Sequence, residues 1–137
     1  MRASALIDTG AIVALVDARD SWHSSCVQAL GGLRLSLVTS AAVLAEVFHL
    51  ITGRRGREAV WRMIQHRAIT VSPIVDADME RIHALMTQDA DMDFADATLV
   101  HLARRESLAT IFTTDNDDFE TYRIEGRKKF TVVPGRR

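Results

Sequence analysis

Cysteine is nearly absent from this sequence, since Cys26 is the only one among 137 residues. A single cysteine excludes an internal disulfide, and no combination of Cys and His has the spacing of a zinc site. Aromatic residues make up 6% of the chain, which is too few to indicate an extended surface for stacking nucleic-acid bases. We therefore expect a protein of a reducing, cytoplasmic compartment.

Long hydrophobic runs are also missing. No apolar stretch is long enough to span a bilayer, and the N-terminus lacks the basic region, apolar core and cleavage site of a secretory signal. The formal net charge of −1 provides no general attraction for a polyanion. Arginine, whose planar guanidinium suits phosphate, accounts for nearly all basic residues, although genomic base composition explains that excess equally well. The sequence predicts no membrane partner.

The overall composition is that of a globular protein, with 47% hydrophobic and 26% charged residues. A chain of this length can bury a sizeable core. No internal repeat, linker or low-complexity segment divides it. We expect residues 1–137 to form a single domain.

The apolar pattern alternates along the chain between the periodicity of strands and that of helices. Strands are expected at residues 3–8, 33–40, 69–73, 108–115 and 128–133, and helices at residues 10–18, 21–30, 40–51, 57–68, 75–90 and 93–107. Asp8 or Thr9 caps the first helix, Gly31 and Gly32 stop the second, and a polar turn follows the fourth strand. This alternation predicts an α/β fold with a mostly parallel sheet covered on both faces.

Two acidic residues stand where expected strands end, Asp8 after the first and Asp115 after the fourth. Ligands of open parallel sheets bind beyond the carboxyl ends of the strands, so we expect these two side chains to converge. Glu46 and Asp96 lie on expected helices, three or four residues from apolar positions. Both are therefore expected to point partly inward.

Four carboxylates gathered in a partly dry site repel one another unless a cation neutralises them. Carboxylates without thiolates or paired imidazoles are hard oxygen ligands, which suit Mg²⁺ or Mn²⁺ rather than zinc. Such a metal lowers the pKa of a bound water and polarises a phosphorus centre. The pattern therefore indicates chemistry on phosphates.

Each acid also has a purely structural interpretation. Asp8 can be a helix cap and nothing more. Asp96 stands three residues after Asp93, a spacing close to that of a capping box. Glu46 can be a solvated helix residue, and Asp115 can belong to an acidic turn. Both interpretations stay open at each position, and only the four acids together favour a site.

Four segments, in this order along the chain, resemble the four acidic motifs of PIN-domain ribonucleases: "LIDTGAIVAL", "TSAAVLAEVFHL", "DFADATLVHLA" and "IFTTDNDDF". Their spacing is similar to that of the small VapC-type toxins of type II toxin–antitoxin systems. The resemblance spans essentially the whole chain and implies a three-layer α/β/α sandwich around a mostly parallel sheet. It also implies Mg²⁺- or Mn²⁺-dependent hydrolysis of RNA by activated water, without a covalent enzyme intermediate.

The resemblance also implies which acids are catalytic, namely Asp8, Glu46, Asp96 and Asp115. The first, third and fourth of these would hold the metal, and the glutamate would bind metal or orient the attacking water. Asp118 is the candidate for an additional site acid. Thr114 is the candidate for a hydroxyl hydrogen bond at the site.

An RNA substrate needs basic residues outside the acidic centre, because phosphate contacts dominate nucleic-acid affinity. The densest basic group is Arg54, Arg55 and Arg57, and residues 127–129 form a second group. Either group is a candidate for RNA binding. A solvated loop or helix end explains each of them at least as well.

The resemblance to VapC-type toxins implies two protein partners, a cognate antitoxin and a second copy of the chain. The helices around Trp22 and Trp61 carry large apolar residues suited to an interface, although such residues more often belong to the core. Other PIN proteins process RNA without an antitoxin, so a non-toxin nuclease is an alternative.

Two further classes compete with a nuclease. Glu46 with His49, and Glu80 with His83, have the three-residue spacing found in di-iron helical bundles. That fold needs four long helices that supply two further carboxylates, whereas residues 33–38 and 108–114 read as strands. The other competitor is a catalytically inactive module that binds RNA or a protein, which the presence of all four acids argues against. No Gly-rich phosphate loop supports nucleotide hydrolysis.

Overall fold

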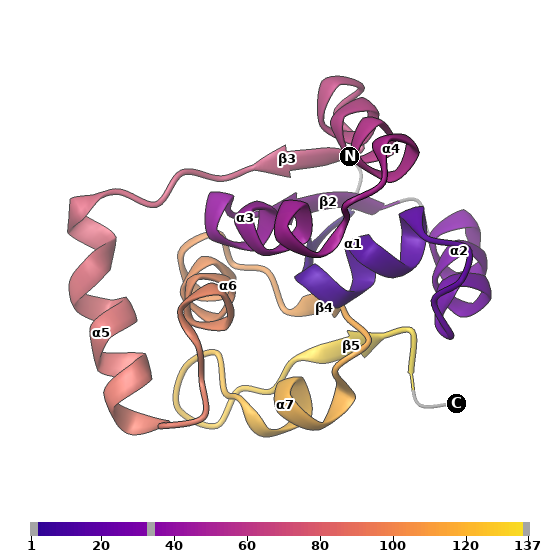
Figure 1. The fold of residues 1–137 in the computed structure, drawn as a ribbon. Coiled ribbons are helices and arrows are strands. Elements are labelled where there is room, and N and C mark those ends of the chain that lie inside the picture. Colours follow the sequence, from indigo (N-terminus) through magenta and orange to yellow (C-terminus); the bar gives the residue numbers. More distant parts are fainter. Residues whose placement is uncertain (1–2, 33–34, 136–137) are drawn as a thin grey trace.

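The computed structural model describes residues 3–32 and 35–135, which form a central sheet surrounded by helices (Figure 1). The sheet has five strands in the order β3-β2-β1-β4-β5, and every pairing in it is parallel. The strands are β1 Ala3–Ile7, β2 Leu35–Thr39, β3 Ile69–Val71, β4 Thr110–Phe112 and β5 Thr131–Val133. The predicted parallel sheet is confirmed.

Helices connect the strands throughout the described part of the chain. They are α1 Thr9–Val16, α2 His23–Gly32, α3 Ala41–Leu50, α4 Arg54–Gln65, α5 Met79–Gln88, α6 Phe94–Arg105 and α7 Asn116–Thr121, with a short 3₁₀ helix, Asp76–Asp78, before α5. Each of the six predicted helices is present. This composition of alternating strands and helices confirms the α/β fold.

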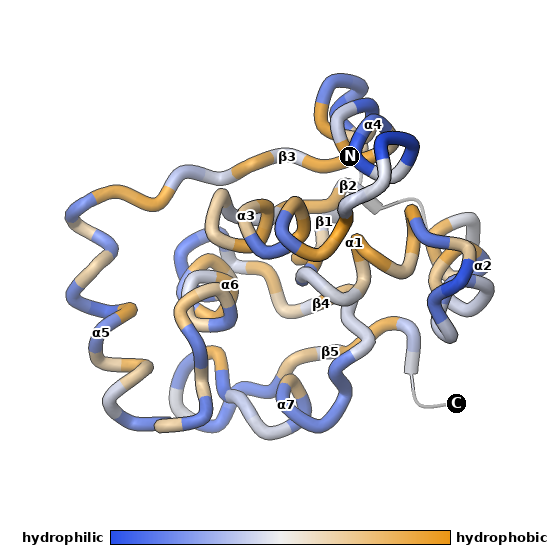
Figure 2. Tube along the Cα trace, viewed as in Figure 1, coloured by the Kyte–Doolittle hydropathy of each residue, from blue (hydrophilic) through white to orange (hydrophobic). Residues whose placement is uncertain are grey.

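Helices cover both faces of the sheet, as the strand residues themselves demonstrate. Successive strand residues point to opposite faces, and Ala5, Leu6 and Ile7 of β1 are all fully buried. Ile111 and Phe112 of β4 are equally inaccessible. Figure 2 shows these apolar segments in the middle of the molecule and the polar stretches of α4 and α5 at its periphery. The three-layer arrangement is therefore the observed one.

The strand order places the carboxyl ends of β1 and β4 side by side at the centre of the sheet. From β1 the chain runs outward through β2 to β3, and then returns to the other side of β1 with β4. Asp8, directly after β1, donates its backbone N–H to the carbonyl of Phe112 in β4, at 3.2 Å. This is the switch point at which open parallel sheets form a crevice.

One helix was not expected from the sequence. The predicted polar turn after the fourth strand contains α7, which begins after Asp115 because that side chain accepts a hydrogen bond from the backbone N–H of Asp118. Phe119 is fully buried and anchors this helix to the core. Six residues with a single buried anchor give too short a periodic pattern for recognition from the sequence.

Several helix boundaries also differ from prediction. The second helix continues through Gly31 and Gly32 instead of stopping before them. The fourth helix begins at Arg54, three residues earlier than expected, with Gly53 as its N-cap. The arginine-rich stretch is therefore the first turn of a helix rather than a loop, because apolar periodicity marks a helix only where its buried face begins.

The alternative hypothesis of a di-iron helical bundle is wrong, because a five-stranded sheet occupies the centre of the molecule. Across the described ranges, no helix is long and apolar enough to cross a membrane.

Candidate active site

The four predicted acids line one pocket of about 320 Å³ at the carboxyl ends of the strands. Thr114 and Asp118, the two additional candidates, line it as well. The complete lining is Asp8, Thr9, Gly10, Glu46, Asp91, Asp93, Asp96, Thr114, Asp115 and Asp118. Six of these ten residues are aspartates, one is a glutamate and none is basic. Negative charge is thus concentrated here without a protein cation to offset it.

Asp8 is the most buried of these acids, with a relative exposure of 6%. It caps α1, since its Oδ1 accepts a hydrogen bond from the backbone N–H of Ala11 at 3.0 Å. Its Oδ2 accepts a hydrogen bond from the hydroxyl of Thr113. Burial raises the pKa of Asp8 to about 6, and these two hydrogen bonds oppose that rise. Asp8 therefore both caps α1 and lines the acidic pocket, so the structural and the functional interpretation are compatible.

Two adjacent threonines after β4 contribute in different ways. Thr113 is fully buried and, besides donating to Asp8, accepts a hydrogen bond from the backbone N–H of Asp115 at 2.9 Å. Thr114, the residue named from the sequence, lines the pocket beside Gly10. A Cβ on Gly10 would lie 2.5 Å from Oγ1 of Thr114, so only glycine fits this close approach.

Glu46 reaches the pocket from α3 and is exposed. Its Oε1 accepts a hydrogen bond from the hydroxyl of Thr9 at 2.8 Å, which links the third helix to the start of the first. Farther in, the hydroxyls of Ser40 and Thr98 lie 2.8 Å apart and join the beginning of α3 to α6. These two contacts hold Glu46 on the same side of the crevice as the acid on α6.

Asp96 lies in the first turn of α6, where Asp93 caps the helix by accepting a hydrogen bond from the backbone N–H of Asp96 at 2.8 Å. Oδ2 of Asp96 accepts a hydrogen bond from the hydroxyl of Tyr122 at 2.9 Å. Burial and the nearby carboxylate of Asp93 raise the pKa of Asp96 to about 7. Burial and the Asp96 carboxylate raise the pKa of the Tyr122 phenol, which stays protonated as the donor.

Asp115 and Asp118 enter the pocket from α7. Asp115 is the N-cap of that helix, with its Oδ1 3.2 Å from the backbone nitrogen of Asp118. A side-chain hydrogen bond with Asp115, together with burial, raises the pKa of Asp118 to about 6. The raised pKa of Asp118 indicates that its ionisation is less favourable beside the Asp115 carboxyl than it would be in water.

The donor chemistry of the pocket fits a hard divalent cation. Carboxylates and a threonine hydroxyl supply oxygen ligands alone, which suit Mg²⁺ or Mn²⁺. Burial is the main cause of the raised pKa values of Asp8 and Asp96, and nearby carboxylates add to the rise; at Asp118 the hydrogen bond with Asp115 is the largest cause. Across residues 3–32 and 35–135, no three His, Cys, Asp or Glu side chains are drawn together into a preformed metal cluster. Mutual repulsion favours such a spread arrangement.

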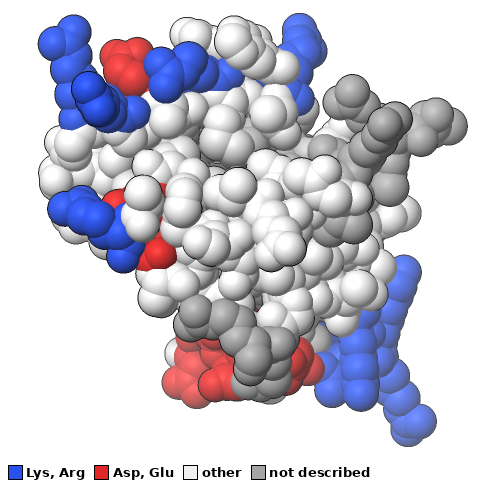
Figure 3. All heavy atoms as spheres, turned by 90° about the vertical axis from the view of Figure 1, so that its right-hand side faces the viewer, with Lys and Arg blue, Asp and Glu red and all other residues white. Residues whose placement is uncertain are grey.

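Charge is unevenly distributed over the face of the molecule on the α2 side. Figure 3 shows acidic side chains gathered at the lower edge of this face, while its middle carries neither Lys, Arg, Asp nor Glu. Cys26 of α2 is fully buried, so its thiol is inaccessible as a nucleophile. No residue of α2 lines the acidic pocket.

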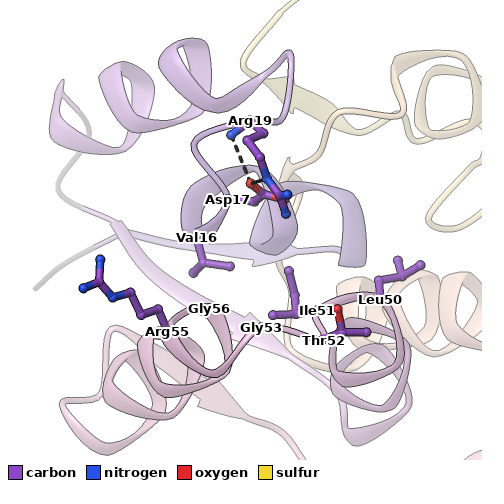
Figure 4. Close-up of a pocket in the computed structure, with 9 residues that line it drawn as sticks. All are labelled: Val16, Asp17, Arg19, Leu50, Ile51, Thr52, Gly53, Arg55 and Gly56. Atoms are coloured by element: carbon purple, nitrogen blue, oxygen red, sulfur yellow. Dashed lines mark hydrogen bonds and ion pairs between the residues drawn. The ribbon is translucent and has the colours of Figure 1, made fainter.

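A second pocket, of about 350 Å³, lies where the ends of α1 and α3 meet the start of α4 (Figure 4). Val16 and Ile51 face each other across it, and Arg19 is turned to Asp17, with 3.1 Å between Nε and Oδ1. Arg55 is the only member of the predicted arginine group that lines it. The mixed lining lacks convergent carboxylates, so this pocket is no second catalytic centre.

The three arginines proposed for RNA binding are exposed on the first turn of α4 and do not line the acidic pocket. Arg57 lies over the ring of Phe48, 5.6 Å from its centroid, and donates to the carbonyl of Ile51. Arg54 and Arg55 project from the same turn.

Sequence reasoning missed the hydrogen-bond partners of the acids. Thr113, Tyr122 and Thr9 each hold one carboxylate, and none was named as such. Asp91 and Asp93 also line the pocket, and Asp93 caps α6 as its spacing from Asp96 indicated. A spacing of four residues from Asp118 to Tyr122 was the one available signal, because it places both on one side of a helix.

Comparison with known proteins yields a family and several relatives. The model of the PIN domain family matches residues 5–125. The chain is 33% identical over 134 residues to Ribonuclease VapC26 of Mycobacterium tuberculosis (strain ATCC 25618 / H37Rv), a match that covers 94% of this chain and 99% of that protein.

Solved structures share the fold at lower sequence identity. The sarcin–ricin-loop-cleaving toxin VapC20 of Mycobacterium tuberculosis superposes with a TM-score of 0.74 and 21% identity, over 82% of this chain and 90% of that one. A toxin–antitoxin complex from Klebsiella pneumoniae gives a TM-score of 0.68 and 19% identity, over 94% and 95% of the two chains. With the acidic pocket at the predicted place in this fold and the family match across most of its length, the chain belongs to the PIN domain family.

Proposed function

We propose that this protein is a divalent-metal-dependent endoribonuclease that hydrolyses RNA phosphodiesters with water, and that it is the toxin of a toxin–antitoxin pair. The single observation that carries the proposal is the all-oxygen pocket at the β1–β4 switch point, in which acids from four motifs meet. The similarity of the chain to Ribonuclease VapC26, over nearly the full length of both proteins, supports the choice of RNA as substrate.

The acids have distinct parts in this proposal. Asp8, Asp96 and Asp115 would hold Mg²⁺ or Mn²⁺ through carboxylate oxygens. The bound cation would lower the pKa of a water molecule and stabilise charge on the phosphodiester. Glu46, whose Oε1 is held by Thr9, would orient the attacking water, and Asp118 would contribute a further acceptor.

Burial and hydrogen bonding position these groups before substrate binds. Asp8 is fixed from two sides by Ala11 and Thr113, so its carboxylate has little freedom to rotate. Asp115 is fixed through its backbone N–H and through its capping interaction with α7. Preorganised carboxylates need no reorganisation when charge develops during phosphodiester hydrolysis.

The pocket lining supports hydrolysis by water over a covalent mechanism. Among the ten lining residues there is no cysteine, serine or lysine. Both lining threonines lack a histidine beside them in the pocket to act as a general base. This lining favours a nucleophile supplied by solvent over a hydroxyl or thiol of the protein.

RNA binding outside the acidic centre is assigned to Arg54, Arg55 and Arg57. All three are exposed on the first turn of α4, where they can contact backbone phosphates. Replacing Arg54 and Arg55 together by Gln is expected to weaken RNA binding uniformly across sequences and to flatten its salt dependence. An unchanged salt dependence in a filter-binding titration would place the RNA contacts elsewhere.

The antitoxin partner is supported by likeness to structures solved as toxin–antitoxin complexes, the one from Klebsiella pneumoniae among them. Homodimerisation is supported by apolar side chains that α3 and α4 expose, with Leu50 59% and Trp61 48% accessible. Trp61 packs against Phe48 with ring centroids 5.2 Å apart. Trp22, by contrast, packs partly buried against the core.

The alternatives are a PIN nuclease that processes RNA without an antitoxin, and an inactive module that binds RNA or protein. Purified protein incubated with total cellular RNA in Mg²⁺, in Mn²⁺ and in EDTA distinguishes activity from binding. We expect metal-dependent cleavage, lost in an Asp96→Asn variant purified identically. Equal cleavage by the two proteins would reveal a contaminating nuclease, and RNA left intact by protein that binds metal would favour the inactive module.

A further inference from the structure

Tyr122 contacts Asp96, one of the acids that line the pocket, although no motif names it. It follows the last residue of α7, is 4% exposed, and donates its hydroxyl to Oδ2 of Asp96 at 2.9 Å. The donor and acceptor lie on different helices, 26 residues apart in sequence. The contact therefore links α7 to α6 at the pocket itself.

Packing fixes the Tyr122 ring in place. Its ring meets that of Phe119 edge to face, with centroids 5.1 Å apart and planes at 83°. Phe119 is fully buried and makes a similar contact with Phe130, at 5.5 Å and 89°. Aromatic side chains packed in this geometry have little rotational freedom. The Tyr122 hydroxyl is thus held at a defined point rather than adapting to the carboxylate.

One short helix with its two caps carries two acids that line the pocket and one tyrosine that contacts the pocket residue Asp96. Asp115 is the N-cap of α7, Asp118 lies in its first turn, and Tyr122 is its C-cap. Asp115 is held by Thr113 at the end of β4, and the other end of the helix is joined to Asp96 by Tyr122. The distance between the α6 acid and the α7 acids is therefore set by this hydrogen bond together with the buried ring of Phe119.

The hydrogen bond also makes the two carboxylate oxygens of Asp96 different from each other. Oδ2 accepts from Tyr122, whereas Oδ1 has no hydrogen-bond partner within residues 3–32 and 35–135. A carboxylate held through one oxygen presents the other in a fixed direction. Hydrogen bonds of this kind to metal-binding carboxylates orient the ligand, and losing one typically weakens metal binding by about 10–100-fold.

We propose that Tyr122 is a positioning residue, which holds the Asp96 carboxylate in the orientation that binds the divalent cation. The inference rests on the proposed metal-dependent nuclease and deepens it. Tyr122 acts through Asp96 and touches neither cation nor RNA. A merely structural role would instead make the hydroxyl a buried group that stabilises the fold without influence on metal affinity.

The test compares Tyr122→Phe with Thr121→Val. The first variant removes only the hydroxyl and keeps the ring that packs on Phe119. The second removes a hydroxyl from the neighbouring residue of the same helix, where Thr121 is exposed and donates to the carbonyl of Asp117. Mn²⁺ affinity is measured without RNA, from the electron paramagnetic resonance signal of free Mn²⁺. Thermal melts of both variants in EDTA report on the fold.

We expect Tyr122→Phe to raise the Kd for Mn²⁺ about tenfold, and Thr121→Val to leave it within twofold of wild type. RNA cleavage by Tyr122→Phe should fall at low Mn²⁺ and recover at saturating Mn²⁺, because the ligands themselves remain. A wild-type Kd in Tyr122→Phe overturns the inference, even when its melting temperature is lowered.

The failure of the inference is distinguishable from failure of the proposed function. If the wild-type protein binds Mn²⁺ and cleaves RNA while Tyr122→Phe binds Mn²⁺ equally well, the nuclease stands and the positioning role falls. If the wild-type protein neither binds Mn²⁺ nor cleaves RNA, both fall together.

Discussion

The hydroxyl of Thr113 donates a hydrogen bond to Oδ2 of Asp8, which lies 105 residues earlier in the sequence. The contact joins the ends of β1 and β4, the neighbouring strands at which the strand order reverses and the crevice of the sheet forms. Through its backbone N–H, Asp115 donates to the same Thr113 oxygen. One buried hydroxyl therefore connects the carboxylate of Asp8 to the backbone of Asp115.

Replacing Thr113 by Val is expected to destabilise the protein by about 1–3 kcal/mol, because buried polar groups of Asp8 and Asp115 lose their partner. Urea denaturation measures the change. Thr70→Val, at an exposed position of β3, serves as the control and should change stability by no more than about 0.5 kcal/mol. Equal stability of the two variants would contradict a structural role for the Thr113 hydroxyl.

Replacing Gly10 by Ala is expected to cost about 1–3 kcal/mol, because the new Cβ would lie 2.5 Å from Oγ1 of Thr114. The double variant Gly10→Ala with Thr114→Ala should recover most of that loss, as measured by a double-mutant cycle. Gly31→Ala, where no atom lies within 4 Å of the added Cβ, should be neutral or stabilising. Purely additive effects at Gly10 and Thr114 would refute the close approach.

The stability of the metal-free protein is expected to fall as the pH rises from about 4 to about 7. Asp8 and Asp96 have pKa values of about 6 and about 7 in the folded protein, above their ordinary value of 3.8. The folded state therefore binds more protons than the unfolded state in this window, and its advantage is lost as these carboxyls ionise.

The measurement is the free energy of unfolding of wild type and Asp8→Asn in EDTA at several pH values. At pH 8 the variant should be the more stable by up to about 3 kcal/mol, from about 1.4 kcal/mol for each pKa unit. The difference should shrink toward pH 4. If the difference in free energy of unfolding between Asp8→Asn and wild type stays constant across this pH range, ionisation of the Asp8 carboxyl is not the cause of the difference.

Mn²⁺ is expected to reverse the loss of stability at pH 8. A ligand that binds only the folded state at about a hundred times its Kd adds about 2.7 kcal/mol. The gain in wild type, measured as a rise in melting temperature, should largely disappear in Asp96→Asn. An equal rise in the two proteins would place the metal outside the pocket.

Much of the fold was predictable because its signals are local. Strands such as residues 3–8 are continuous apolar runs, and helices such as residues 93–107 carry a cap and an apolar stripe within a few turns. The positions of Asp8 and Asp115 at the ends of strands were predictable for the same reason. The strand order then places these carboxyl ends together.

The hydrogen-bond partners were not predictable for a physical reason. Thr113 and Thr114 are equivalent in the sequence, and the strand pairing alone decides which hydroxyl turns inward to Asp8. Tyr122 reaches Asp96 because a six-residue helix, held by one buried phenylalanine, turns it toward α6. Such contacts depend on tertiary distances that periodicity does not encode.

The central claim is that Asp8, Glu46, Asp96 and Asp115 form one metal-dependent site for RNA cleavage. The most direct test is the single-turnover rate of cleavage of one labelled RNA in Mn²⁺ by Asp8→Asn, Glu46→Gln, Asp96→Asn and Asp115→Asn. Asp76→Asn, which removes an exposed carboxylate before α5, is the matched control. We expect each pocket variant to lose about a hundredfold or more and the control to match wild type. Pocket variants that cleave at the wild-type rate would contradict the claim.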